Sequence, residues 1–328
     1  MLLAGDIGGT KTLLGLFSAA DRRPTLVAAA SFPTVEHKSL ADIIARFLEG
    51  GQRPPIEAAC FGVAGPVREQ RATLTNVPWA VAAGDIATSF SIASVSLLND
   101  LQAMAWAVPV LEGAELATLQ EGRAVSGGNA ALIAAGTGLG EALLHNVDGR
   151  FVPAASEGGH ADFSPRTAGE IALLQALTAR YGRAEWEHVL SGPGLVNIHR
   201  FLHPHGCAAC DPSVDPLLAP SVISHAALER RCPQCVESLE MFVAVYGAEA
   251  GNLALRCLST AGLYIGGGIA PKILPALREP AFLDAFRSKP PMTALLETVP
   301  VSVILNERAA LLGAAVFANS RSGRQTPH

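Results

Sequence analysis

The sequence lacks any excess of positive charge and any long uninterrupted apolar stretch. Its 24 Lys and Arg residues are outnumbered by 29 Asp and Glu residues, which gives a formal net charge of −5 at pH 7. Binding to the phosphates of nucleic acids requires a basic surface, so we expect no nucleic-acid partner. Charged residues such as Asp100, Glu141 and Arg256 interrupt the most apolar stretches before these reach the ~20 residues that span a bilayer. No membrane partner is expected either.

The amino-terminal segment lacks the basic residues of a secretory signal peptide, and Asp6 interrupts its apolar run. We therefore expect a cytoplasmic protein, whose six cysteines are thiols or metal ligands rather than disulfides. With 49% hydrophobic and only 16% charged residues, the chain can bury a sizeable core, which excludes global disorder. A length of 328 residues predicts two domains, or one large domain with two lobes.

Strand-like and helix-like segments alternate along the first half of the chain, and the pattern becomes largely helical after residue 170. We expect strands at 58–64, 94–98 and 263–265 and helices at 40–49, 101–111, 171–181, 194–202 and 236–258. Alternating strands and helices predict an α/β fold with a mixed or parallel sheet.

Two glycine-rich turns interrupt apolar strands, one within residues 1–17 and one within residues 130–144. The turns are Gly8-Gly9-Thr10 and Gly136-Thr137-Gly138, and each predicts a β-hairpin. Because the same unit occurs twice, more than 120 residues apart, we expect a duplicated α/β architecture. A third glycine run, Gly266-Gly267-Gly268, follows the last apolar strand.

These turns are candidates for binding a nucleotide. Glycine lets the backbone approach a polyphosphate closely, and turn amides and the Thr10 hydroxyl can donate to phosphate oxygens. Asp6 is a candidate to hold a hydrated Mg²⁺ ion, and the third run suits a flat approach to an adenosine. Taken singly, each turn is equally compatible with an ordinary structural hairpin.

Polar residues at the ends of other segments are candidates for substrate binding. Asp100 follows a predicted strand, where open α/β sheets place their ligands, although Asp is also a preferred helix N-cap. Glu157 and His160 flank two glycines and can hold the hydroxyls of a sugar, or lie in a solvated turn. Glu187 alone is typical of an exposed helix carboxylate.

Taken together, these motifs resemble those of bacterial glucokinases, sugar kinases related to hexokinases. Their order and approximate spacing match over nearly the whole chain, from Leu3 to about Ala318. The motifs that carry the resemblance are Asp6-Ile7-Gly8-Gly9-Thr10, Thr75-Asn76 with Trp79, Asn99-Asp100, Gly136-Thr137-Gly138-Leu139-Gly140, Glu157-Gly158-Gly159-His160, Leu190-Ser191-Gly192-Pro193-Gly194-Leu195 and Gly266-Gly267-Gly268-Ile269.

The resemblance implies an α/β, two-lobed actin-like ATPase (ribonuclease H-like) fold with a central cleft. Residues 1–110, completed by 300–328, would form a small domain, and residues 111–299 a large one. The carboxyl-terminal helix of this family returns to the first lobe. The implied activity is ATP-dependent phosphorylation of D-glucose at its 6-hydroxyl, which yields glucose 6-phosphate and ADP and is the first step of glycolysis. ATP and Mg²⁺ are the implied cofactors.

The resemblance also implies roles for individual residues. Asp100 matches the catalytic base. The implied sugar-binding residues are Asn99, Asp100, Glu157, His160 and Glu187, and the implied ATP-binding residues are Gly5, Asp6, Ile7, Gly8, Gly9, Thr10, Gly136, Thr137, Gly138, Gly266 and Gly267.

Two alternatives remain open from the sequence. One is a kinase for another hexose, such as fructose, mannose or an N-acetylated amino sugar. The other is a non-catalytic sugar sensor on the same fold. Such sensors usually carry a DNA-binding helix-turn-helix before the first glycine hairpin, whereas here the hairpin begins at residue 2. The sequence does not determine the oligomeric state, and a homodimer is one option.

The cysteine pattern departs from the family. Cys207-x2-Cys210 and Cys232-x2-Cys235 are separated by 21 residues, a spacing close to that of Cys₄ zinc sites. The related repressor-kinase family carries a zinc motif of different spacing, C-x-C-G-x-x-G-C-x-E, which this sequence lacks. We expect four unpaired thiols and assign no metal site, with structural zinc as the alternative.

Overall fold

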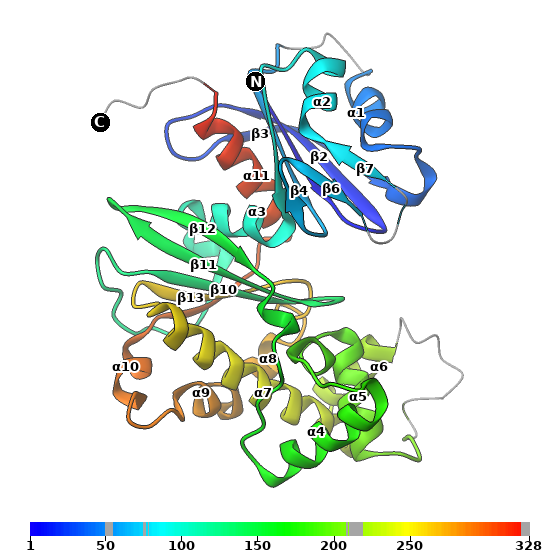
Figure 1. Ribbon diagram of the computed structural model, residues 1–328. Helices are drawn as coiled ribbons and strands as arrows, with labels where there is room; N and C mark the ends of the chain where they lie inside the picture. The colour runs from blue at the N-terminus through cyan, green and yellow to red at the C-terminus, as the bar shows by residue number, and fades with distance from the viewer. Residues whose placement is uncertain (50–54, 75–76, 78, 208, 210–218, 323–328) are drawn as a thin grey trace. The chain divides into compact units, whose positions relative to one another are not determined.

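The chain forms two compact units, residues 1–112 with 306–328 and residues 113–305. The computed structural model (Figure 1) describes all residues except 50–54, 75–76, 78, 208, 210–218 and 323–328.

The expected boundary at residue 300 assigns strand β14 (Val301–Ile304) to the first unit, but β14 pairs with β13 (Gly262–Gly266) of the second. That strand therefore belongs to the second unit. Among the described residues, no helix is both long and apolar enough to cross a membrane.

The main sheet of the first unit has the strand order β3-β2-β1-β4-β8. Its strands are β1 (Leu2–Ile7), β2 (Lys11–Ser18), β3 (Thr25–Pro33), β4 (Ala58–Val63) and β8 (Ser94–Asn99), and a small second sheet contains β5 (Val67–Arg68), β6 (Arg71–Thr73) and β7 (Ala80–Ala82). The predicted β1–β2 hairpin is confirmed. Strands β1, β4 and β8 run parallel, with Ile7 opposite Val63 and Val63 opposite Asn99. Their carboxyl ends therefore meet at one edge.

Helices cover the sheet of the first unit. They are α1 (Leu40–Leu48), α2 (Ala83–Phe90), α3 (Asp100–Ala107) and α11 (Ala309–Ser320). Helix α1 begins after Ser39, whose side chain accepts from the Asp42 amide, and buries one apolar stripe that includes Ile43 and Ile44. Helix α11 packs on α3, β1 and β4 (Figure 1). The carboxyl-terminal helix thus returns to the first unit, as the resemblance implied.

The sheet of the second unit repeats this topology. Its order is β12-β11-β10-β13-β14-β9, with β9 (Leu116–Gln120), β10 (Ala130–Ala135), β11 (Leu139–Val147) and β12 (Arg150–Ser156). In the first unit, β1, β2 and β3 pair antiparallel in chain order, and β4 and β8 then run parallel to β1. In the second unit, β10, β11 and β12 pair antiparallel in the same way, and β13 and β14 then run parallel to β10. The duplicated architecture that the two glycine turns predict is confirmed.

A long buried helix organises the second unit. The helices are α4 (Ala168–Tyr181), α5 (Gly192–Leu202), α6 (Ala219–Leu228), α7 (Pro233–Cys257), α8 (Leu274–Leu277), α9 (Pro280–Arg287) and α10 (Thr293–Thr298), with 3₁₀ turns η4 (Gly158–His160) and η5 (Trp186–His188). Helix α7 lies against β10 and is itself covered by α5, α6 and α9. Its central part, including Phe242 and Tyr246, is buried on all sides, which explains a largely apolar sequence without one polar face.

Candidate functional site

In the first unit, the candidate residues gather at the carboxyl edge of the parallel strands. Asp6 lies near the end of β1, and Asn99 and Asp100 join β8 to α3. Asn99 is the N-cap of α3, because its Oδ1 accepts from the amides of Leu101 and Gln102 at 3.0 and 3.4 Å. Asp100 is the first helical residue, and its Oδ1 also accepts from the Leu101 amide. The N-cap role considered for Asp100 therefore belongs to Asn99.

The charges of Asp6 and Asp100 act on each other. Burial, followed by the negative charge of Asp100, raises the pKa of the Asp6 carboxyl to about 6, against the opposing charge of Lys11. A cation would stabilise the ionised form of a buried carboxyl that is influenced by a second carboxylate.

The β1–β2 turn is held by a residue that the sequence analysis missed. The Thr34 hydroxyl donates to the Gly8 carbonyl at 2.9 Å and lies 2.9 Å from the Thr12 hydroxyl, while the Thr34 amide donates to the Thr10 carbonyl. Thr34 follows β3 and is fully buried, so its contacts depend on strand pairing that no local motif encodes. Gly5 has a packing role, because a Cβ there would lie 2.6 Å from the Phe61 ring.

In the second unit, Glu187 lies against the β10–β11 turn. Its Oε2 accepts from the Leu139 amide at 2.9 Å, and a Cβ on Gly138 would approach the same oxygen to 2.4 Å. Glu187 is half-buried in η5, so the sequence-based description of an exposed helix carboxylate is wrong. The Ser191 hydroxyl, which caps α5, donates to the Glu187 carbonyl at 2.7 Å.

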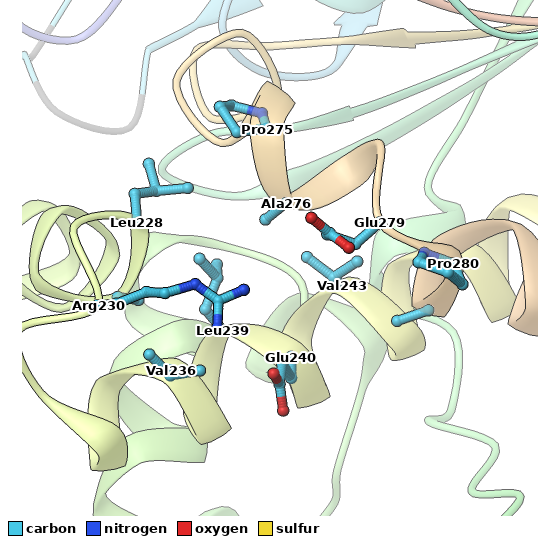
Figure 2. A pocket seen from close by; sticks show the side chains of 12 residues that line it. Leu228, Arg230, Val236, Leu239, Glu240, Val243, Pro275, Ala276, Glu279 and Pro280 are labelled. Atoms are coloured by element: carbon cyan, nitrogen blue, oxygen red, sulfur yellow. The ribbon is translucent and has the colours of Figure 1, made fainter.

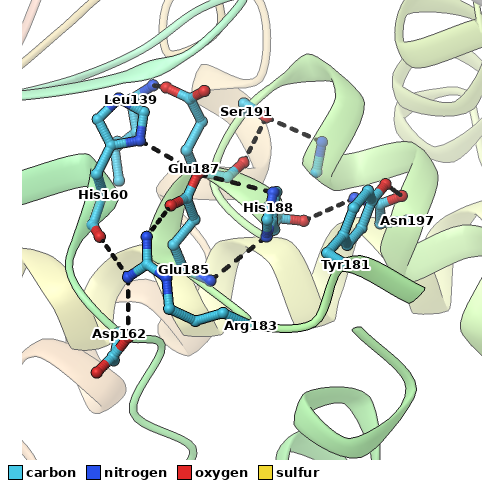
Figure 3. A network of polar contacts seen from close by, with 11 residues as sticks. Leu139, His160, Asp162, Tyr181, Arg183, Glu185, Glu187, His188, Ser191 and Asn197 are labelled. Carbon is cyan, nitrogen blue, oxygen red and sulfur yellow. Dashed lines mark hydrogen bonds and ion pairs between the residues drawn. The ribbon is translucent and has the colours of Figure 1, made fainter. Parts of the chain in front are cut away.

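His160 belongs to the same set as Glu187 (Figure 3). Its Nδ1 lies 3.1 Å from Oε1 of Glu185, and ligand-type atoms of His160, Glu185 and Glu187 all lie within 4.8 Å of one another. The hydrogen bond to Glu185 raises the pKa of His160 against the effect of burial, and the charges of Glu187 and Glu157 add to this increase. The structure thus brings His160, Glu185 and Glu187 together, and Glu157 lies directly before η4, close enough for its charge to act on His160.

Glu185 is the residue of this set that sequence analysis missed. Besides His160, it contacts Arg183, whose Nη2 donates to Glu185 Oε2 at 2.5 Å. Arg183 Nη1 also donates to the His160 carbonyl at 2.9 Å (Figure 3). Glu185 therefore fixes both the ring and, through Arg183, the backbone of His160. The available signal was its position two residues before Glu187, which places both carboxylates beside one 3₁₀ turn.

The third glycine run borders the β10 strand. Gly267 has φ +83°, and a Cβ there would lie 2.3 Å from the Ala135 carbonyl oxygen. Gly266 ends β13, whereas a Cβ on Gly136 or Gly268 would meet no atom within 4 Å. Gly136 and Gly268 are therefore open to a close approach from outside, and Gly267 is required by the fold itself.

Thr75 and Asn76 lie outside the described residues, and Trp79 is buried in the core of the first unit.

The pocket in Figure 2 lies between α6, α7 and the α8–α9 segment, and apolar side chains such as Leu239 and Val243 line it. Among the described residues that line it there is no predicted site residue, so this pocket is separate from the candidate site.

The chain is similar to known proteins over nearly its whole length. A model of the glucokinase family matches residues 3–321. The chain is 39% identical to a glucokinase of Nostoc punctiforme, covering 97% of this chain and 98% of the relative. It is 36% identical to a glucokinase of Mesorhizobium japonicum, covering 98% and 92% of the two chains. The similarity extends over nearly the full length of both relatives.

Solved structures show the same similarity. The chain resembles a glucokinase from an Antarctic psychrotroph with a TM-score of 0.85 and 29% identity, covering 97% of this chain and 98% of that chain. A ROK-family glucokinase of Streptomyces griseus, solved in complex with glucose and AMPPNP, shares the fold with a TM-score of 0.65 and 24% identity, covering 97% and 99%. These neighbours have the actin-like ATPase fold, so the expected fold class is confirmed.

Proposed function

The chain belongs to the glucokinase family, and from this premise we propose that it transfers the γ-phosphoryl group of ATP to the 6-hydroxyl of D-glucose. The products are glucose 6-phosphate and ADP. One observation carries the proposed mechanism. Asn99 caps α3, so helix capping does not account for Asp100, which lies beside Asp6 at the carboxyl edge of the sheet.

Asp100 acts as the general base in this proposal. Phosphoryl transfer depends mainly on positioning and charge stabilisation, and one residue must accept the proton of the attacking hydroxyl. Asp100 offers a carboxylate at the first position of α3, directly after the N-cap Asn99. Asn99 would orient the sugar through its Nδ2, which donates to the Gly65 carbonyl at 3.3 Å and has a second hydrogen to offer.

The second unit supplies the proposed sugar contacts. Glu157, His160 and Glu187 combine carboxylate acceptors with an imidazole that can donate or accept, which suits a molecule with several hydroxyls. A polar pocket of this kind discriminates strongly against analogues that lack a hydroxyl, because its own polar groups would be left unpaired. Glu185 holds the His160 ring in place and is a positioning residue.

The glycine turns are the proposed ATP-binding elements. The Gly8 and Gly136 amides close their own turns by donating to the carbonyls of Lys11 and Gly138 at 3.0 and 2.8 Å. The proposed phosphate donors are therefore the amides of Gly9 and Thr10 in the first unit and of Thr137 in the second. Turn amides bind phosphate oxygens without adding side-chain bulk.

Mg²⁺ fits the donor set at Asp6. Burial and Asp100 raise the pKa of its carboxyl. A hydrated divalent cation would stabilise the ionised form of such a carboxyl. When bound, Mg²⁺ would neutralise charge on the phosphates. Asp6 would hold the ion, and Asp100 would keep its role of accepting the proton.

A coupled kinase assay over hexoses and phosphoryl donors tests the proposed function. We expect turnover with D-glucose and ATP and much lower efficiency with fructose, mannose and N-acetylglucosamine. Higher efficiency with one of those sugars would assign the protein to a different hexose. Sugar binding without turnover would support the sensor alternative and refute the kinase.

We place this activity in the cytoplasm, where ATP is available and the cysteines stay reduced. A homodimer remains a prediction, which light scattering on purified protein would test.

A further inference from the structure

The second unit contains three cysteines and a histidine outside the residues proposed to bind sugar and nucleotide. Cys207 follows α5, Cys232 is the N-cap of α7, and Cys235 lies in the first turn of α7. The Sγ atoms of Cys207 and Cys235 are 3.7 Å apart. The Cys232 thiol, which donates to Gln234 Oε1 at 3.3 Å, lies near both of them. Cys232 and Cys235 are buried. Two distant segments of sequence therefore bring three sulfur atoms together.

The distance between the sulfurs excludes a disulfide and fits both a thiol hydrogen bond and a shared metal ion. A disulfide requires a separation of about 2.05 Å, which the 3.7 Å between Cys207 and Cys235 clearly exceeds. Two thiolates bound at about 2.3 Å to one tetrahedral zinc ion lie roughly 3.8 Å apart. The observed 3.7 Å matches the separation of two ligands on the same zinc ion.

A histidine supplies a fourth donor. Ligand atoms of His199, Cys207 and Cys235 all lie within 4.8 Å of one another. The Nε2 atom of His199 is buried and has no hydrogen-bond partner among the described residues. A buried polar atom without a partner is costly, and here it lies beside two sulfur atoms.

Hydrogen bonds define the tautomer of His199. The Ser238 hydroxyl donates its only hydrogen to the Gln234 carbonyl at 2.7 Å. Its oxygen must therefore accept from His199 Nδ1, which lies 2.9 Å away. The proton is consequently on Nδ1, and Nε2 presents a lone pair. Metal-binding histidines typically have this arrangement, in which the second nitrogen donates to a neighbour that orients the ring.

We propose that Cys207, Cys235 and Nε2 of His199, which lie within 4.8 Å of one another, hold a structural zinc ion, and that Cys232 exchanges its hydrogen bond to Gln234 for the fourth position. Three sulfurs and one imidazole nitrogen make a closed Cys₃His set, which is typical of structural rather than catalytic zinc. Each thiol would release its proton on binding the metal. The site would tie the end of α5 to the start of α7. Cys210, the remaining cysteine of the pattern, lies outside the described residues.

Metal content is the first test. Tag-free protein, purified without added metal, should contain close to one zinc per chain by elemental analysis. After zinc is removed with a chelator, the protein should take up one Co²⁺ per chain and show the absorption of tetrahedral cobalt bound by thiolates. Removal should also lower the melting temperature, and Zn²⁺ should restore it. Folded protein that contains no zinc and takes up neither ion stoichiometrically would overturn the proposal.

Substitutions identify the ligands. Zinc content should fall sharply in Cys207→Ser, Cys235→Ser and His199→Ala variants. Cys60→Ser is the matched control, because Cys60 is a buried thiol in β4 of the first unit, and it should retain zinc. Zinc retained in folded Cys207→Ser and Cys235→Ser variants would refute the site.

X-ray absorption fine structure on the wild-type zinc protein does not depend on whether any variant folds. We expect three sulfurs at about 2.3 Å and one nitrogen at about 2.0–2.1 Å. Four sulfurs, together with loss of zinc in Cys210→Ser but not in His199→Ala, would overturn the assignment of His199.

Discussion

At the scale of single residues, the two sets of candidate side chains are held in different ways. Asp6 and Asp100 repel each other at the sheet edge of the first unit. His160 is instead fixed by a hydrogen bond between its Nδ1 and Oε1 of Glu185. The first set is thus suited to bind a cation and to accept a proton, and the second set to form stable contacts with a neutral polar ligand.

Replacing Glu185 tests its positioning role. In Glu185→Gln the largest cause of the raised His160 pKa is removed, so the pKa of His160 should fall. The raised pKa keeps the ring protonated to higher pH in the wild type, and the variant should deprotonate at lower pH. NMR titration of the ring measures this, and an unchanged pKa would contradict the assigned contact.

Glucose affinity tests the proposed sugar contacts. Glu157→Gln and His160→Ala should each weaken glucose binding about ten- to a hundred-fold, since losing one charged hydrogen-bond partner costs about 1.5–3 kcal/mol. Isothermal calorimetry measures the affinity. His145→Ala, at an exposed position on β11, is the control and should bind normally. Unchanged affinity in both test variants would remove them from the site.

At the scale of secondary structure, apolar patterns predicted the interior elements but not the edges. Helix α1 and the strands β4 and β10 were predictable because burial requires their apolar stripes or runs. Strand β3 is an edge strand that is largely exposed, so its sequence carries no burial pattern. The unit to which β14 belongs depends on its pairing with β13, which is a long-range contact.

The same distinction applies to the candidate site. The positions of the glycine turns and of Asp100 were predictable because each lies next to an apolar strand, whereas their proposed roles rest on the resemblance. Glu185 and Thr34 were not, since their roles arise from contacts with His160 and Gly8 across long stretches of sequence.

The contact of α11 with α3 should be sensitive to one added methyl group. A Cβ on Gly313 would lie 1.8 Å from the Ala103 carbonyl oxygen, so Gly313→Ala should force the helices apart and lower the free energy of unfolding by about 1–3 kcal/mol. Denaturant unfolding measures this. Gly84→Ala in α2, where a Cβ meets nothing within 4 Å, should be neutral or slightly stabilising. Equal stability of the two variants would contradict the packing.

At the scale of the whole molecule, a buried acidic group links stability to pH. Burial, followed by the charge of Glu249, raises the pKa of Glu141 from 4.5 to about 8, although Arg256 opposes this. Because the folded state holds this proton more tightly than the unfolded state, the contribution of Glu141 to stability falls as pH rises from 4.5 to about 8.

Replacing Glu141 with its neutral isostere tests this linkage. Glu141→Gln should gain stability relative to the wild type progressively over that pH interval, and the gain should level off above it. Melting curves of both proteins across the interval measure the difference. A difference that does not depend on pH would show that Glu141 ionises normally in the folded protein.

The central claim is that Asp100 accepts the proton of the attacking hydroxyl, and one substitution tests it most directly. Asp100→Asn keeps the side-chain shape, and Asn99 still caps α3, so the protein should remain folded and bind glucose and ATP normally. A general base contributes about 10²–10⁴-fold to the rate, so kcat should fall by a factor of about 10²–10⁴ or more. Asp85→Asn, in the first turn of α2, is the matched control and should keep its kcat. Near-normal turnover in Asp100→Asn, with unchanged melting temperature and glucose affinity, would contradict the account.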